Sequence, residues 1–117
     1  MAAHKRKSVR KRVTQAMMVT DAFTGEGLGR IGNLSNDGMM LITPKALADE
    51  HYFQLHFSLQ APGFVPHKVE IGVQCLWCDP ARTANTFWVG CKVIDISPPD
   101  QAMLKKWVTQ AEEIVPG

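Results

Sequence analysis

The stretch HYFQLHFSL, residues 51–59, carries the strongest periodic signal in the chain. Apolar and polar side chains alternate through it, and the apolar set is Phe53, Leu55, Phe57 and Leu59. Because successive side chains of a strand point to opposite faces, this alternation predicts a β-strand with one buried face. The fold should therefore contain a sheet that packs one apolar face against a core.

The same alternation continues on both sides of residues 51–59. After a loop predicted over APGFVP (61–66), it predicts strands in KVEIGVQCLW (68–77) and FWVGCKVID (87–95). Three shorter strand candidates precede it: VTQAMMVT (13–20), LGRIGNLS (28–35) and GMMLIT (38–43). Residues 44–50 are predicted to form a turn or a short helix. We expect about six strands, which close most economically as a small antiparallel barrel because closure removes exposed edges.

The C-terminal stretch SPPDQAMLKKWVTQAEEI (97–114) changes to a helical period. Its apolar positions are Met103, Leu104, Trp107, Val108 and Ala111. Ser97 can cap the first turn, Pro98 suits the first helical position, and Asp100 suits the positive helix end. The sequence therefore predicts a mainly β fold with one amphipathic C-terminal helix, which packs on the barrel through Trp107.

Length and composition favour one domain. The chain has 117 residues and an apolar fraction of 45%, enough for a single compact core. No apolar run approaches the roughly 20 residues that span a bilayer, and no secretory signal follows the first charges. We therefore expect no membrane span and a cytoplasmic location. Three cysteines, an odd number, are expected to be reduced rather than paired in disulfides.

Charge is distributed unevenly along the chain. Residues 1–12 contain six of the 13 basic residues and no acid: Lys5, Arg6, Lys7, Arg10, Lys11 and Arg12. The remaining residues, 13–117, carry 7 basic and 11 acidic groups. The sequence thus predicts a flexible basic arm over residues 1–12, attached to a single mildly acidic domain over 13–117. Such an arm is either a solvated tail or a segment that attracts phosphate groups.

Two short patterns suggest chemistry that their context does not support. GLGRIG (27–32) matches the dinucleotide fingerprint, but that fingerprint opens a helix and here another strand is expected to follow. Cys75 and Cys78 form a CxxC pair, but residues three apart on a strand point to opposite faces unless a bulge intervenes. Cys91 and His67 do not complete a zinc spacing. We expect no metal site and no cofactor.

No combination of residues predicts catalysis. The four histidines are scattered: His4, His51, His56 and His67. None has a Ser or Cys partner in a recognisable triad arrangement. Asp49 and Glu50 are adjacent acids beside His51, but an exposed turn explains this cluster better than acid or base catalysis does. The residues therefore give no positive case for an enzyme.

Two motifs in order give the chain a family resemblance. Arg6 and Arg10 are spaced RxxxR, and Asn33-x-Ser35-x-x-Gly38 fits the pattern [D/N]xSxxG. Together they resemble the PilZ domain, the small bacterial barrel that binds cyclic di-GMP. The stretch VGCKVIDISPPDQAMLKKWV, which begins at residue 89, also looks like the last strand, Ser-Pro junction and closing helix of that family. The resemblance covers nearly the whole chain and implies a PilZ-like fold.

The resemblance implies a site with a mobile half and a fixed half. An arginine fork can bind the O6 and N7 acceptors of guanine, stack on the base or attract a phosphate. Arg6 and Arg10 would close over cyclic di-GMP, while Asn33 and Ser35 would supply polar groups from the barrel surface. Gly38 would let the backbone turn and approach the ligand closely. The predicted accessory basic residues are Lys7 and Arg12.

The arm admits a second register. In many family members the second arginine directly precedes the first strand, whereas Arg10 is followed here by Lys11-Arg12-Val13. If Arg12 took the second position, Ser8 would stand at the first and the motif would be broken. We prefer Arg6 and Arg10, since a flexible arm tolerates two extra residues.

The resemblance also implies a role without catalysis. Ligand would close the arm and create a surface for an unidentified effector protein in motility, adhesion or polysaccharide production. One alternative is a protein-interaction module that binds no nucleotide. Another is a binder of RNA or single strands, which is disfavoured because the aromatic positions mostly fall on the inward phase: Phe53, Phe57, Trp77 and Phe87. We expect no nucleic-acid partner.

Overall fold

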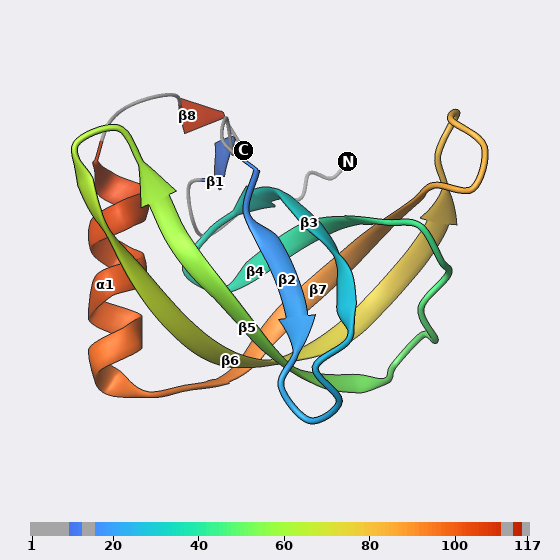
Figure 1. Cartoon of the computed structure of the whole chain (residues 1–117), viewed down its shortest axis with the longest axis horizontal. Helices are drawn as coiled ribbons and strands as arrows, with labels where there is room; N and C mark the ends of the chain where they lie inside the picture. Colours follow the sequence, from blue (N-terminus) through green and yellow to red (C-terminus); the bar gives the residue numbers. More distant parts are fainter. Residues whose placement is uncertain (1–9, 13–15, 111–113, 116–117) are drawn as a thin grey trace, which may run out of the picture.

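The computed structural model describes residues 10–12, 16–110 and 114–115. Their elements appear in Figure 1. They are β1 (Arg10–Arg12), β2 (Met18–Asp21), β3 (Gly27–Leu34), β4 (Gly38–Thr43), β5 (Tyr52–Ala61), β6 (Phe64–Pro80), β7 (Phe87–Ile96), α1 (Pro98–Thr109) and β8 (Ile114–Val115). Within these residues, no helix is both long and apolar enough to cross a bilayer.

Six antiparallel strands form a ring. The order is β2-β5-β6-β7-β4-β3, and an additional pairing between β2 and β3 closes it. This ring with one C-terminal helix confirms the fold predicted from the sequence. The two short strands β1 and β8 lie outside the ring: β1 pairs with the end of β3, and β8 pairs with β1.

The terminal strands were not predicted. β1 falls inside the predicted arm. The last three residues of the arm are therefore paired with the domain: Lys11 and Arg12 with β3, and Arg10 with β8. The helix was predicted within a stretch that reached Ile114, but it ends at Thr109 and Gln110 adopts an extended backbone. Ile114 and Val115 instead form β8, in keeping with the preference of β-branched side chains for strands.

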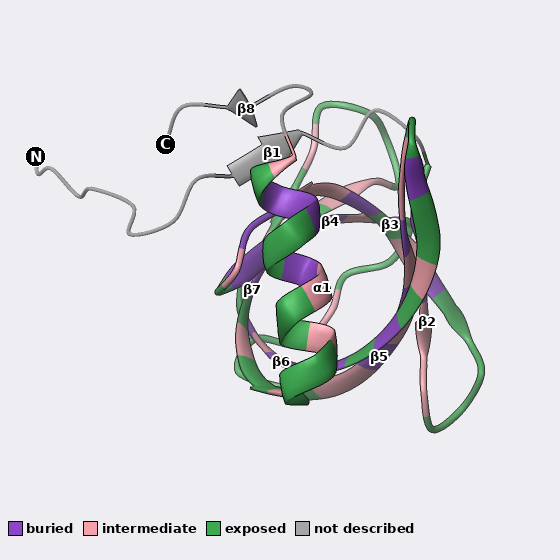
Figure 2. Ribbon diagram, turned by 90° about the vertical axis from the view of Figure 1, so that its left-hand side faces the viewer, coloured by how far each residue is buried: buried purple, intermediate pink, exposed green. Residues whose placement is uncertain are grey.

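The inner face of the ring forms the core. Leu55, Phe57 and Leu59 are buried, and Phe53 packs against the same cluster, as the alternation in residues 51–59 predicts. Figure 2 shows buried positions on several strands of the ring and on α1, which lies across one end of it.

Helix α1 begins and docks as its sequence predicts. Ser97 accepts a hydrogen bond from the Asp100 amide at 3.3 Å, and Pro98 begins the helix. Asp100 also ties the helix to β6, because its carboxylate lies 3.2 Å from His67 Nε2 and accepts from the Glu70 amide at 3.1 Å. At the other end Trp107 is buried among the core residues. The helix is therefore part of the folded domain.

Strand β6 departs from the prediction at its start and at an internal bulge. It begins at Phe64 instead of residue 68, after a tight hairpin in which Gly63 has a φ of 75°, a conformation that favours glycine. Further along, a β-bulge between Cys75 and Trp77 shifts the pairing with β7. The prediction that Cys75 and Trp77 share the buried face is wrong. Cys75 is buried and Trp77 is exposed, because the bulge adds one residue and reverses the alternation.

Candidate ligand-binding site

The β3–β4 turn contains the residues of the [D/N]xSxxG motif. The Ser35 amide donates to the Gly38 carbonyl at 2.9 Å. The Ser35 hydroxyl lies 2.9 Å from Asp37 Oδ1 and 3.2 Å from the Gly38 carbonyl oxygen. Ser35 is only 1% exposed, so the prediction that its side chain lies on the barrel surface is wrong. Its hydroxyl instead fixes the turn, while Asn33 is half-buried at the end of β3.

This role of Ser35 predicts a stability effect. Ser35→Ala removes a buried hydroxyl whose single proton has two acceptors within hydrogen-bond distance, so the free energy of unfolding should fall by about 1 kcal/mol. Chemical denaturation of the variant measures this change. Ser58→Ala, at a half-buried serine on β5, is the matched control and should change stability less. Weakened ligand binding with unchanged stability would contradict the structural role.

A single row of paired residues joins the arm to the sheet. Arg12 on β1 is the register partner of Asn33 on β3, and Asn33 is the partner of Met40 on β4. Met40 in turn faces Gly90 on β7, which faces Trp77 on β6. The backbone of Arg12 and the start of the turn motif, which are remote in sequence, thus lie side by side. Arg10 is also in β1, opposite Val115 of β8, whereas Arg6 and Lys7 lie outside the described residues.

The far end of this row is an exposed indole over a glycine. A Cβ atom placed on Gly90 would collide with atoms of both rings of the Trp77 indole. The indole therefore lies against the backbone of β7, and it is 40% exposed. Sequence reasoning did not identify Trp77 as a site residue, because the bulge that turns it outward was not visible. The one sequence signal was Gly90, a glycine inside a strand pattern, which often marks close approach of another group.

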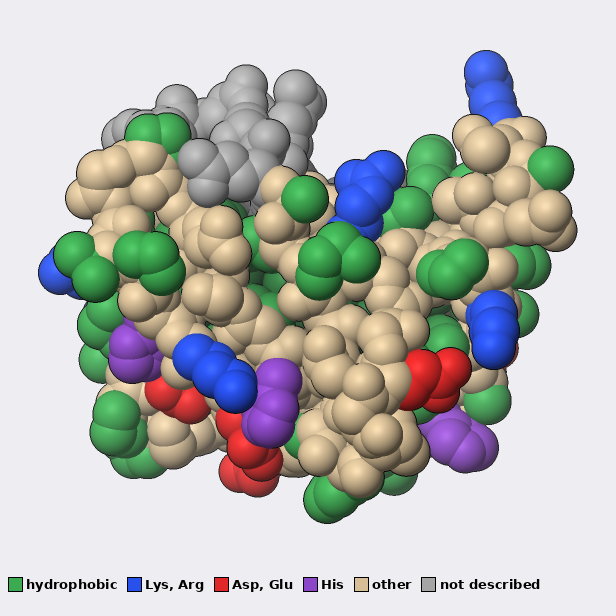
Figure 3. Space-filling model, in the orientation of Figure 1, with side chains coloured by type: hydrophobic (Ala, Val, Ile, Leu, Met, Phe, Trp, Pro, Cys, Tyr) green, Lys and Arg blue, Asp and Glu red, His purple; other side chains and the backbone are tan. Residues whose placement is uncertain are grey.

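Basic side chains flank the row on the described part of the chain. Arg30 on β3 and Lys92 on β7 are both exposed, and Lys92 is the register partner of Gly38. Among the described residues drawn in Figure 3, the acidic side chains lie in the lower half of the face, away from the end that carries β1. This arrangement suits an anionic ligand beside β1 and β3.

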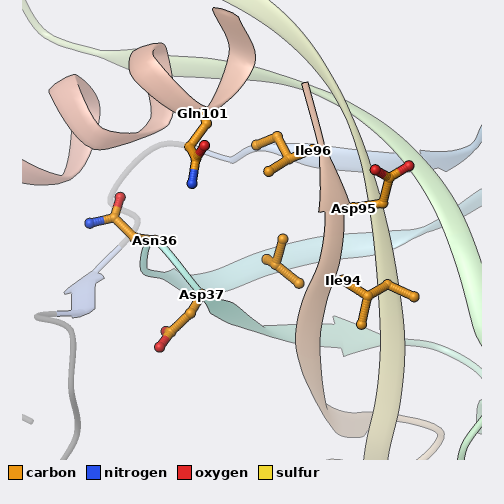
Figure 4. Close-up of a pocket in the computed structure, with 7 residues that line it drawn as sticks. Asn36, Asp37, Ile94, Asp95, Ile96 and Gln101 are labelled. Carbon is orange, nitrogen blue, oxygen red and sulfur yellow. The ribbon is translucent and has the colours of Figure 1, made fainter. Parts of the chain in front are cut away.

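A pocket lies next to the turn but has different chemistry. Figure 4 shows it between the turn, the end of β7 and α1, with Asn36, Asp37, Asp95 and Gln101 on its walls. Its volume is about 360 Å³. Two carboxylates make it unfavourable for phosphate. Within the described chain, Asn36 Oδ1 is buried without a hydrogen-bond partner, so a polar donor would fit there better than an anion.

The three cysteines are free thiols, and two of them, Cys75 and Cys91, are buried. In the described residues, no group of three or more His, Cys, Asp or Glu side chains could hold a metal ion. Burial, with smaller effects of the Cys75 and Cys78 thiols, raises the pKa of Cys91 to about 12. Burial also raises the pKa of Cys75. Both thiols therefore remain protonated and unreactive near neutral pH. The bulge after Cys75 is the feature that chelation by Cys75 and Cys78 would require, but the burial of Cys75 disfavours its thiolate.

Two histidines have structural partners. His56 Nε2 lies 2.7 Å from Glu70 Oε1, and His67 contacts Asp100 at the start of α1. The hydrogen bond from His56, followed by one from Gln54, holds the pKa of Glu70 below its usual value. These contacts link β5, β6 and α1, so they explain both histidines through the fold.

The described residues form a ring of six strands, closed by a C-terminal helix and with β1 beside the end of β3. Residues 4–110 match the sequence profile of the PilZ domain. The chain therefore belongs to the PilZ domain family, whose members are ligand-binding adaptor modules. No curated protein sequence matches the chain.

Solved structures agree with this assignment at the level of fold. The chain is similar to the Bacillus subtilis inhibitor of motility MotI/DgrA, with a TM-score of 0.72 and 14% identity over 90% of this chain and 49% of that one. It is similar to the PilZ domain of Escherichia coli YcgR with c-di-GMP, with a TM-score of 0.66 and 15% identity over 88% of both chains. It is also similar to MrkH of K. pneumonia in complex with c-di-GMP, with a TM-score of 0.68 and 16% identity over 89% of this chain and 51% of that one. The chain thus spans about half the length of MotI and of MrkH.

Proposed function

We propose that the protein is a cyclic di-GMP receptor that closes its basic arm over the dinucleotide. The observation that carries this proposal is the register of β1 and β3, in which Arg12 lies opposite Asn33. The backbone of Arg12, at the end of the arm, therefore lies beside the first residue of the turn motif, which supports a site shared by the two. Membership of the PilZ family and the likeness to two complexes with c-di-GMP support the same ligand.

The residues take distinct roles in this proposal. Arg6 and Arg10 hold a guanine or a phosphate, with Lys7 and Arg12 as accessory charges. Asn33 contacts the ligand from the sheet. Ser35 and Gly38 act through the turn that they hold in place.

The exposed indole extends the site. Gly90 is two strands from Asn33 along the row, a span of about 10 Å at the usual strand spacing. A compact dinucleotide that contacts Asn33 can thus bring a base over Trp77, which presents a flat aromatic face. Lys92 and Arg30 lie on neighbouring rows and add positive charge.

The proposed receptor works in the cytoplasm without catalysis and without a cofactor. If the ligand orders part of the arm, this ordering costs conformational entropy, which contacts with the ligand must exceed. The closed arm then presents a new surface to an effector protein in motility, adhesion or polysaccharide production. The competing function is a PilZ-type interaction module that binds no nucleotide.

Calorimetric titration of the full chain with cyclic di-GMP tests the proposal. We expect saturable binding that weakens with added salt, because two phosphates meet a basic arm. Cyclic di-AMP is the matched control, since it keeps the phosphates but lacks the O6 acceptor of guanine, and it should bind more weakly. No heat of binding with a folded protein would instead favour the interaction module.

Trp77→Ala separately tests the extended site. Loss of a stacking surface should weaken cyclic di-GMP binding by about 1 kcal/mol, or several-fold. Trp88→Ala is the control, because Trp88 is also exposed on β7 but pairs with Ile42 in a different row. Equal losses for the two variants, measured by the same titration, would show that neither indole has a specific contact.

A further inference from the structure

The turn between β2 and β3 displays an aromatic side chain to solvent. Phe23 at this turn is 84% exposed. The turn is held rigidly: Asp21 Oδ1 accepts from the amides of Phe23 and Thr24 at 2.8 and 3.2 Å. The Asp21 carbonyl accepts from Gly25 at 2.8 Å, and Gly25 has a φ of 77°. Phe23 therefore stands on a fixed support, and this exposure is not explained by the ligand site.

A pocket opens directly beside this turn. Its volume is about 320 Å³. Its apolar lining includes Leu28, Leu47 and Phe53, all of which pack on the core. The rim carries Glu26 from the turn and Lys45 from the segment after β4, and these form an exposed ion pair at 3.8 Å. The chain thus carries an aromatic projection and an apolar socket next to one another.

We propose that this face is a self-complementary dimer interface, in which Phe23 of each copy occupies the pocket of the other. The β2–β3 turn projects from the end of the molecule opposite β1 and β8 (Figures 1 and 2). Dimers formed here leave β1 and the end of β3 that pairs with it open. The inference therefore does not depend on cyclic di-GMP binding.

The partner is a second copy because the projection and the socket belong to the same turn: Asp21 and Glu26, which flank Phe23 in sequence, line the pocket. A two-fold axis between them satisfies both contacts at once, as in an isologous interface. A different protein would need its own aromatic projection and its own socket at the same separation. Phe23 cannot easily fill the pocket of its own chain, since hydrogen bonds to Asp21 hold the turn in place.

Charge at the rim is compatible with this pairing. Each copy brings Lys45 and Glu26, so two Lys45–Glu26 pairs can form between copies in place of the pairs within each copy. The carboxylate of Asp21 already accepts two amide hydrogen bonds from its own turn. The remaining rim charges are thus balanced across a two-fold axis.

The interface is small, so the dimer should be weak. An aromatic side chain buries about 150–250 Å², and two of them with their surroundings give less than the roughly 1,200–2,000 Å² of a stable interface. We expect a monomer–dimer equilibrium that responds to protein concentration from micromolar to millimolar. A single central aromatic anchor should dominate its energy.

Sedimentation velocity of the full chain over that concentration range tests the proposal. Phe23→Ser should weaken dimerisation by roughly 10-fold or more without lowering the melting temperature, since Phe23 is exposed in the monomer. Val65→Ser is the matched control: Val65 is 80% exposed at the β5–β6 hairpin and should leave dimerisation unchanged.

Concentration-dependent methyl spectra identify the socket. The methyl resonances of Leu28 and Leu47 should shift with concentration in the parent and stay constant in Phe23→Ser. A parent that remains monomeric at millimolar concentration would overturn the proposal. So would a dimer that Phe23→Ser does not weaken, or one that leaves both leucine resonances unshifted.

Discussion

Trp107→Ala should lower the free energy of unfolding by about 3–5 kcal/mol, the range for removing a fully buried large aromatic side chain. Trp107 is 1% exposed and is packed with Leu104 and Val108 on the inner side of α1. Its indole Nε1 also donates to the Gln60 carbonyl on β5 at 3.0 Å. The variant therefore loses apolar burial and leaves a carbonyl without its donor. Chemical denaturation measures the loss.

Two further variants separate the loss of apolar burial from the loss of the hydrogen bond to Gln60. Trp107→Phe keeps an aromatic ring but cannot donate to Gln60, so it should cost less than the alanine variant. Lys105→Ala, at an exposed position on the same helix, should be close to neutral. If Trp107→Ala melted within about a degree or two of the parent, the helix would contribute little to the fold despite its burial.

The second large effect concerns the arginines of the arm. Alanine at Arg6 or at Arg10 should weaken cyclic di-GMP binding by about 1–3 kcal/mol, roughly 10- to 100-fold, if each makes a directional contact with guanine or phosphate. Arg12→Ala should then cost less and should lose its effect at high salt, as expected for a nearby charge. Titrations of the three variants at two salt concentrations provide the measurement.

The alternative register predicts the opposite order. Arg12→Ala would then be severe and Arg6→Ala mild. The position of the Arg12 backbone opposite Asn33 makes this comparison the decisive one. Equal, salt-sensitive losses at all three positions would contradict a specific clamp and indicate a general basic arm. Asn33→Ala provides a reference on the sheet and should weaken binding in either register.

Regular periodicity was sufficient to predict the ring and the helix. Leu55, Phe57 and Leu59 alternate without interruption, and each faces the core. The cap at Ser97 is a local feature that depends on neighbouring residues alone. What could not be predicted are the places where pairing with another strand alters the period. The bulge before Trp77 is set by the register of β6 against β7, and such a register is a property of two distant segments.

The candidate site could be predicted only as far as local sequence patterns define it. A motif with fixed spacing pointed to the turn from Asn33 to Gly38, and the structure shows how that turn is held. The motif did not reveal that Ser35 is buried, because serine suits both a ligand contact and a turn. Trp77 could not be placed beside the motif, because four cross-strand pairings separate it from Arg12.

The way β3 divides its edge between β1 and β2 has a mechanical consequence. Arg12 pairs with Asn33, while the Met17 carbonyl accepts from the Ile31 amide. Met17 follows Arg12 by five positions, whereas Ile31 precedes Asn33 by only two. β1 and β2 therefore make separate pairings with β3, and the pairing of β2 is the one that closes the ring. We expect that the pairing of β1 can change without opening the ring, so that an event at the arm leaves the core undeformed.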